Sequence, residues 1–88
     1  MKQHIIVHGL VQGVGFRQFT KMEADKLSIY GWVHNKTDNT VEIAAEGDDK
    51  AMRSFLTSVE KGPRFSKVDK IEVNPIDEVD HKQSFKVK

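Results

Sequence analysis

Hydrophobic and polar positions in the first half of the chain follow two different periods. Ile5–Val7 lie between histidines within residues 3–10, which predicts a short strand. In residues 16–27 the apolar side chains recur every three or four positions, which predicts an amphipathic helix of about three turns. Residues 29–35 alternate with a period of two, and residues 41–46 follow after a polar turn, so these two segments predict a hairpin.

The second half contains the helix with the clearest boundaries. Residues 48–60 place apolar side chains on one face, and Asp48 is a suitable N-terminal cap. Gly62 favours the end of this helix, and Pro63 cannot continue it. The pattern therefore predicts a helix between these signals.

The last third predicts one long and one short strand. The longer strand covers residues 68–73 and ends before residues 74–75, Asn-Pro; residues 76–83 read as a polar loop and residues 84–87 as a short strand. The order strand, helix, strand, strand, helix, strand is the split βαβ pattern. We therefore predict an α+β, ferredoxin-like βαββαβ sandwich. It has an antiparallel sheet, two helices on one face and a short C-terminal strand, and residues 1–88 form one domain.

Composition narrows the classes of function. The chain has 88 residues, 14 basic and 13 acidic side chains, a net charge of +1 and no cysteine. A disulfide, a thiolate nucleophile and a cysteine metal site are therefore excluded. The balanced charge disfavours nucleic-acid binding through bulk charge, and no apolar run approaches the roughly 18 residues of a membrane span. We expect a cytoplasmic monomer without nucleic-acid or membrane partners.

The start of the first helix has the features of an anion site. It follows Gly13 and Gly15 and lacks the capping side chain that Asp48 gives the second helix. Its free N–H groups and its dipole favour an anion, and Arg17 in the first turn is favourable only if an anion is present. The alternative is that the glycines only form the turn. Neither the dinucleotide fingerprint nor a Walker loop is complete, so the pattern favours a small phosphate group.

Asn35 is predicted to lie beside this loop. In a split βαβ unit the strands before and after the first helix run parallel, so their C-terminal ends lie at one edge of the sheet. Alternation places Asn35 on the helix side of the sheet and His34 on the opposite side. An asparagine at a strand end is often only a turn former, but beside an arginine its amide could hold a water.

These segments resemble two motifs of the acylphosphatase family. Residues 9–17 read Gly-Leu-Val-Gln-Gly-Val-Gly-Phe-Arg, similar to G-x-V-Q-G-V-x-F-R, and residues 31–35 read Gly-Trp-Val-His-Asn, similar to the second motif. The resemblance covers essentially the whole chain. It implies an enzyme with a ferredoxin-like fold that hydrolyses the carboxyl-phosphate anhydride of small acyl phosphates, without metal or cofactor.

The resemblance also implies a role for each residue of the site. Arg17 would bind the phosphoryl group and Asn35 would position the attacking water. The main-chain cradle and its support would comprise Gln12, Gly13, Val14, Gly15, Phe16 and Thr20. The chain departs from the family pattern at His34, in place of a lysine or arginine, and at Asn39, in place of a glycine. Asparagine tolerates the left-handed backbone of a turn.

Three other interpretations are weaker. Tyr30 and Trp32 on the open sheet face could stack nucleic-acid bases, but the neighbouring strand has no aromatic residue and carries Glu42 and Glu46. The four histidines show no metal-ligand spacing. A non-catalytic anion-binding or regulatory module of the same fold is the main alternative, and the presence of both the arginine and the asparagine favours the enzyme.

Overall fold

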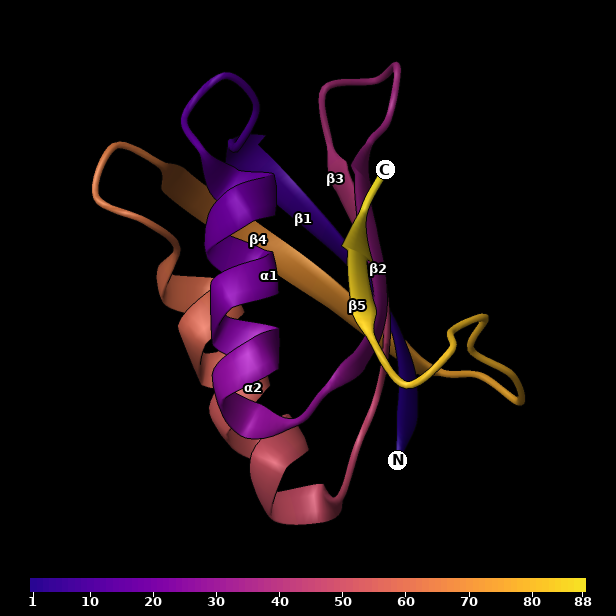
Figure 1. The fold of residues 1–88 in the computed structure, drawn as a ribbon. Helices are drawn as coiled ribbons and strands as arrows, with labels where there is room; N and C mark the ends of the chain where they lie inside the picture. The colour runs from indigo at the N-terminus through magenta and orange to yellow at the C-terminus, as the bar shows by residue number, and fades with distance from the viewer.

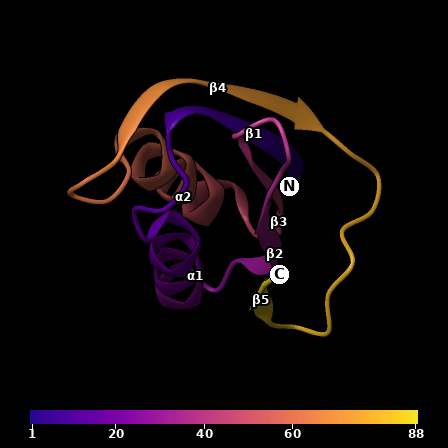
Figure 2. The same ribbon diagram turned by 90° about the horizontal axis from the view of Figure 1, so that it is seen from above.

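Two helices cover one face of a five-stranded sheet in the structure, a computed structural model that describes all 88 residues (Figure 1). The elements in chain order are β1 (Lys2–Leu10), α1 (Phe16–Leu27), β2 (Tyr30–Asn35), β3 (Val41–Glu46), α2 (Asp49–Lys61), β4 (Lys67–Pro75) and β5 (Phe85–Val87). Figure 2 shows the sheet curving around the two helices. The predicted ferredoxin-like α+β fold is confirmed. Neither helix is long and apolar enough to cross a bilayer.

The sheet brings the ends of β1 and β2 to one edge. Its strand order is β4-β1-β3-β2-β5, and β1 and β2 each pair antiparallel with β3. The strands β1 and β2 therefore run parallel, as the split βαβ pattern predicts. The four strands from β4 to β2 form the predicted antiparallel sheet. The short strand β5 pairs in parallel with β2, with Gly31 opposite Phe85, so the complete sheet is mixed.

The strand β4 is longer than the sequence predicts. It was expected to end at Val73, but it continues through Pro75, which pairs with Gln3 of β1. Proline cannot donate a hydrogen bond to a ladder, yet it is accepted on an edge strand, and β4 lies at the edge of this sheet. The Asn-Pro pair therefore forms the last two residues of β4 instead of following the strand.

The caps of α2 agree with the prediction to within one residue. Oδ1 of Asp48 accepts a hydrogen bond from the N–H of Ala51 at 2.7 Å, so Asp48 is the N-cap and the helix begins at Asp49. Gly62 ends the helix with a φ of 72°.

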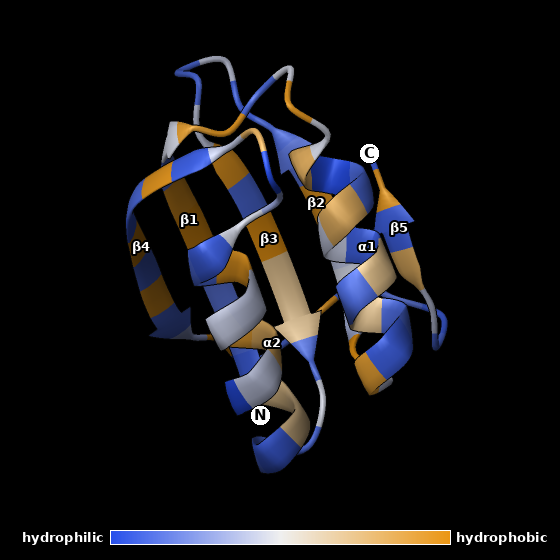
Figure 3. Ribbon diagram, turned by 90° about the vertical axis from the view of Figure 1, so that its left-hand side faces the viewer, coloured by the Kyte–Doolittle hydropathy of each residue, from blue (hydrophilic) through white to orange (hydrophobic).

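Apolar side chains from both layers fill the space between the helices and the sheet. Figure 3 shows hydrophobic residues, in orange, along β1 and β3, which lie behind the helices in that view. The buried phenylalanines come from α1 (Phe16), α2 (Phe55) and β5 (Phe85), and the rings of Phe55 and Phe85 lie 6.0 Å apart. Burial of one such side chain contributes about 1.5–3 kcal/mol. Because Phe16 is the first residue of α1, the core fixes the point at which this helix begins.

Gly31 allows β2 to lie close to β3. Its φ is 147°, and a Cβ at this position would lie 1.9 Å from the carbonyl oxygen of Ala44. No side chain fits at that distance, which explains a glycine four residues before Asn35.

Candidate functional site

The loop between β1 and α1 and the hairpin between β2 and β3 lie at the same end of the molecule, beside the end of β5 (Figure 1). A cavity of about 200 Å³ opens between these segments. Its lining comprises Val11, Gly13, Gly15, Phe16, Arg17, Gln18, Asn35 and Val87. The structure therefore brings Arg17 and Asn35 to one cavity together with part of the predicted cradle.

The loop that lines the cavity carries main-chain N–H groups without acceptors. Gly15 precedes α1 in the left-handed conformation (φ 77°, ψ 18°), and no side chain caps the helix. The N–H groups of residues 12–18 donate no hydrogen bond within the protein. A Cβ at Gly13 or Gly15 would meet nothing within 4 Å, so the loop borders open space at these two positions. Such a loop at a helix N-terminus can bind a phosphoryl group.

Arg17 adds a positive charge to the first turn of α1. Its side chain is exposed, and Nη1 donates to the main-chain oxygen of Lys88 at 3.2 Å. No Asp or Glu side chain lies within salt-bridge distance of its guanidinium. A cation here repels the positive end of the helix dipole. The arrangement is therefore favourable when an anion lies between them.

Asn35 carries the one buried side-chain polar atom that has no hydrogen-bond partner. It is the last residue of β2 and is half-buried, and its Oδ1 is fully shielded without a donor. An unmet buried acceptor costs about 1–3 kcal/mol, and such atoms are normally satisfied. Asn35 also lines the cavity, so its side chain lies beside the space that a water or a ligand would occupy.

Three of the predicted site residues do not line the cavity. Thr20 is buried, and its Oγ1 donates to the carbonyl oxygen of Phe16 at 2.8 Å, one turn below the cradle. Val14 is partly buried and packs against the core. The side chain of Gln12 points away from the cavity and donates to the β2–β3 hairpin.

Sequence reasoning missed three residues that line the cavity. Val11 and Gln18 flank the predicted cradle, and their apolar or neutral side chains gave no chemical signal. Val87 comes from β5 and is 38% exposed. It reaches the cavity because β5 pairs in parallel with β2, with Val33 opposite Val87, and no local pattern in the sequence reveals that pairing.

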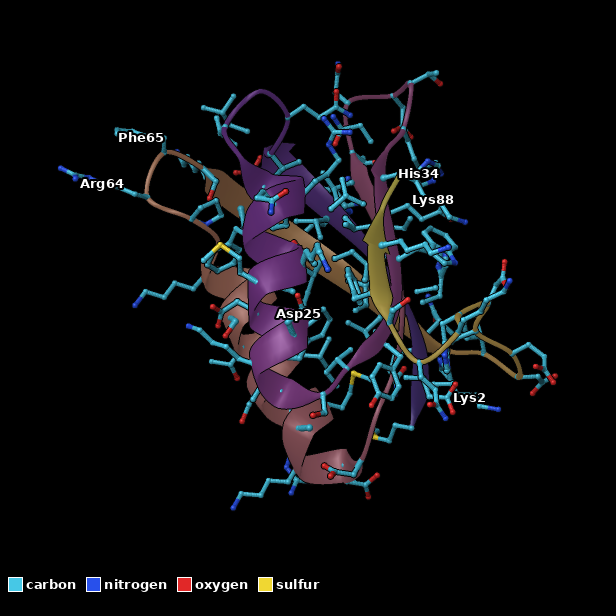
Figure 4. The ribbon with its side chains drawn as sticks, viewed as in Figure 1. Lys2, Asp25, His34, Arg64, Phe65 and Lys88 are labelled. Atoms are coloured by element: carbon cyan, nitrogen blue, oxygen red, sulfur yellow. The ribbon has the colours of Figure 1, made fainter.

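None of the four histidines lines the cavity: three lie on β1 and β2 and His81 lies in the β4–β5 loop, and each is hydrogen-bonded to a glutamate. Figure 4 shows His34 on the face of the sheet that turns away from the helices, as alternation predicts. Nε2 of His34 is hydrogen-bonded to Oε1 of Glu42, and Nε2 of His4 is hydrogen-bonded to Oε2 of the same carboxylate. No group of three or more His, Asp or Glu side chains is arranged to hold a metal ion.

The Glu42 carboxylate predicts an acid-dependent contribution to stability. Partial burial raises the pKa of the Glu42 carboxyl, but hydrogen bonds from His34 and His4 outweigh it, so the pKa lies below its ordinary value of 4.5. A lowered folded pKa means that the carboxylate stabilises the fold above pH 4.5, and this stabilisation is lost as the pH falls through the folded pKa.

We therefore expect Glu42→Gln to lower the free energy of unfolding by up to about 1 kcal/mol at pH 7 and by less at pH 3. Urea unfolding at the two pH values measures this difference. Glu78→Gln, in an exposed loop, is the matched control and should change neither value. An equal loss at both pH values for Glu42→Gln would contradict the role of the ionised carboxylate.

Comparisons with known proteins agree with the fold and the motifs. A sequence model of the acylphosphatase family matches residues 3–87. An acylphosphatase from Bacillus licheniformis is 48% identical over 87 residues, which cover 99% of this chain and 97% of that protein. The crystal structure of acylphosphatase from Bacillus subtilis matches with a TM-score of 0.92 and 47% identity, covering 100% of this chain and 99% of that one. An acylphosphatase structure from Coxiella burnetii matches with a TM-score of 0.91 at 30% identity, covering 99% and 90%.

Proposed function

The chain belongs to the acylphosphatase family, and on that premise we propose that Arg17, Asn35 and the N–H groups of the β1–α1 loop perform its reaction. The protein is an enzyme that hydrolyses acyl phosphates to a carboxylate and inorganic phosphate. A non-catalytic anion-binding module is not favoured, since acylphosphatases are similar over nearly the whole chain.

The phosphoryl group is held at the start of α1. Two of its oxygens accept hydrogen bonds from the planar guanidinium of Arg17, and the third accepts from main-chain N–H groups in the cradle. The observation that carries this assignment is the run of N–H groups without acceptors in residues 12–18, next to an arginine that no Asp or Glu side chain pairs. These donors stabilise the charge on the transferring group, which is the main requirement of phosphoryl transfer.

Asn35 positions the water. Its amide N–H₂ can donate to the water oxygen, and its Oδ1 can accept one hydrogen of the water once the side chain turns that oxygen toward the cavity. The water oxygen forms a bond to phosphorus as the bond from phosphorus to the acyl oxygen breaks, and that electron pair leaves on the carboxylate. The second water hydrogen passes as a proton to a phosphoryl oxygen. A carboxylate is a weak base, so its departure requires no general acid.

Other residues support this arrangement. Thr20 steadies the first turn of α1 through the carbonyl of Phe16, and is therefore a positioning residue. Because the chain itself supplies every donor named above, we propose that the reaction needs no metal or cofactor. The single-domain, monomeric state and the cytoplasmic location that the sequence leads us to expect belong to the same proposal.

Phosphate release from benzoyl phosphate or acetyl phosphate tests the proposed function. We expect the purified protein to accelerate release strongly over buffer, and to the same extent after prolonged incubation with EDTA. If the protein did not accelerate phosphate release over buffer, the proposed activity would be contradicted. Loss of activity only in the presence of EDTA would show that a metal is required.

A further inference from the structure

We propose that the side chain of Gln12 is a positioning residue that sets the place of Asn35 relative to the phosphate cradle. The inference rests on the proposed function, because it concerns the water that Asn35 holds. Gln12 was expected to contribute only its main chain to the cradle. Its side-chain amide instead links the β1–α1 loop to the β2–β3 hairpin that follows Asn35.

The contacts of Gln12 close the base of the β2–β3 hairpin. Its Nε2 donates to the carbonyl oxygen of Lys36 at 2.8 Å and to that of Thr40 at 2.9 Å. A carboxamide nitrogen has two hydrogens, so both of its donors are used. The carbonyl oxygen of Thr40 also accepts from the N–H of Lys36 at 2.9 Å. One side chain from the loop is therefore bound to both arms of the hairpin.

These two carbonyl groups belong to the residues next to the Asn35–Val41 pair of the β2–β3 ladder. Lys36 directly follows Asn35, and Thr40 directly precedes Val41, its partner in the β2–β3 ladder. The hydrogen bonds of Gln12 thus act one peptide away from the backbone of Asn35. The side chain of Gln12 does not line the cavity, which excludes it as a direct ligand of the phosphoryl group.

Beyond the β1–β3 and β2–β3 ladders, which both end at Val41, the hydrogen bonds of Gln12 are those that join the loop to the hairpin. The strands β1 and β2 are not neighbours, because β3 lies between them. No other hydrogen bond joins residues 11–15 to residues 36–40. Misplacement of a reacting group by about 1 Å can cost about 100-fold in rate. Loss of the Gln12 contacts should therefore move the water that Asn35 holds, while Arg17 and the N–H groups keep the phosphate.

Gln12→Met tests this role, because methionine has a similar length and no donor. We expect kcat for benzoyl phosphate to fall about 10- to 100-fold and the inhibition constant of inorganic phosphate to change less than about threefold. Gln83→Met, whose side chain makes no hydrogen bond, is the matched control and should leave both constants unchanged. Urea unfolding of each variant verifies that it is folded.

A double-mutant cycle separates positioning from a general structural effect. If Gln12 acts through Asn35, Gln12→Met should lower kcat less than about twofold further in an Asn35→Ala background. The full loss in that background would overturn the proposal. So would an unchanged kcat in Gln12→Met, or a phosphate inhibition constant that rises as much as kcat falls. Failure of the proposed function looks different, since then wild-type protein would be inactive or Asn35→Ala would leave kcat intact.

Discussion

Replacement of Arg17 by alanine should lower kcat/KM for benzoyl phosphate by about 1,000-fold or more and abolish measurable binding of inorganic phosphate. The variant loses the side chain that holds two phosphoryl oxygens and the positive charge at the start of α1. Steady-state kinetics of phosphate release, with a phosphate titration, measures both effects.

Arg17→Lys is the informative control. Lysine keeps the charge but presents a single ammonium in place of the planar fork, so it should recover part of the phosphate affinity and little of the turnover. Both variants should remain folded, because the Arg17 side chain is exposed and makes one hydrogen bond, to the main chain of Lys88. Activity of Arg17→Ala within about tenfold of wild type would contradict the assigned role.

Replacement of Asn35 by alanine should lower kcat by about 100- to 1,000-fold and leave the binding of inorganic phosphate nearly unchanged. The asparagine holds the water and makes no proposed contact with the phosphoryl group. The substitution removes a buried oxygen that has no partner in the protein, so the fold loses no hydrogen bond of this side chain. Stopped assays at saturating benzoyl phosphate measure kcat.

Asn35→Asp keeps the size of the side chain and an oxygen acceptor. Its carboxylate faces a bound phosphate, so it should weaken phosphate binding as well as turnover, in contrast to the alanine variant. A kcat for Asn35→Ala within about threefold of wild type would show that another group places the water.

Local chemistry allowed much of the fold and five of the eight residues that line the cavity to be predicted from the sequence. The capping carboxylate of Asp48 and the glycine at Gly62 act within one turn of their helix, so their pattern is readable. Asn39 adopts the left-handed conformation, with a φ of 73°, in a turn that Asp38 steadies through hydrogen bonds to Thr40. This explains how the chain accommodates asparagine in place of the family glycine.

Contacts between distant residues explain what the sequence did not predict. The parallel pairing of β5 with β2 brings Val87 to the cavity, and the edge position of β4 lets it continue through Pro75. The amide of Gln12 bonds to carbonyls 24 and 28 residues away. None of these contacts has a period or a local motif, because each depends on which elements the fold places side by side.

The central claim is that the start of α1 holds the phosphoryl group while Asn35 acts on the water. Calorimetric titration of inorganic phosphate into wild type, Arg17→Ala and Asn35→Ala tests it most directly. The account predicts that phosphate binding is lost in Arg17→Ala and retained in Asn35→Ala. If Asn35→Ala weakened phosphate binding as severely as Arg17→Ala, the division of roles between the two residues would be contradicted.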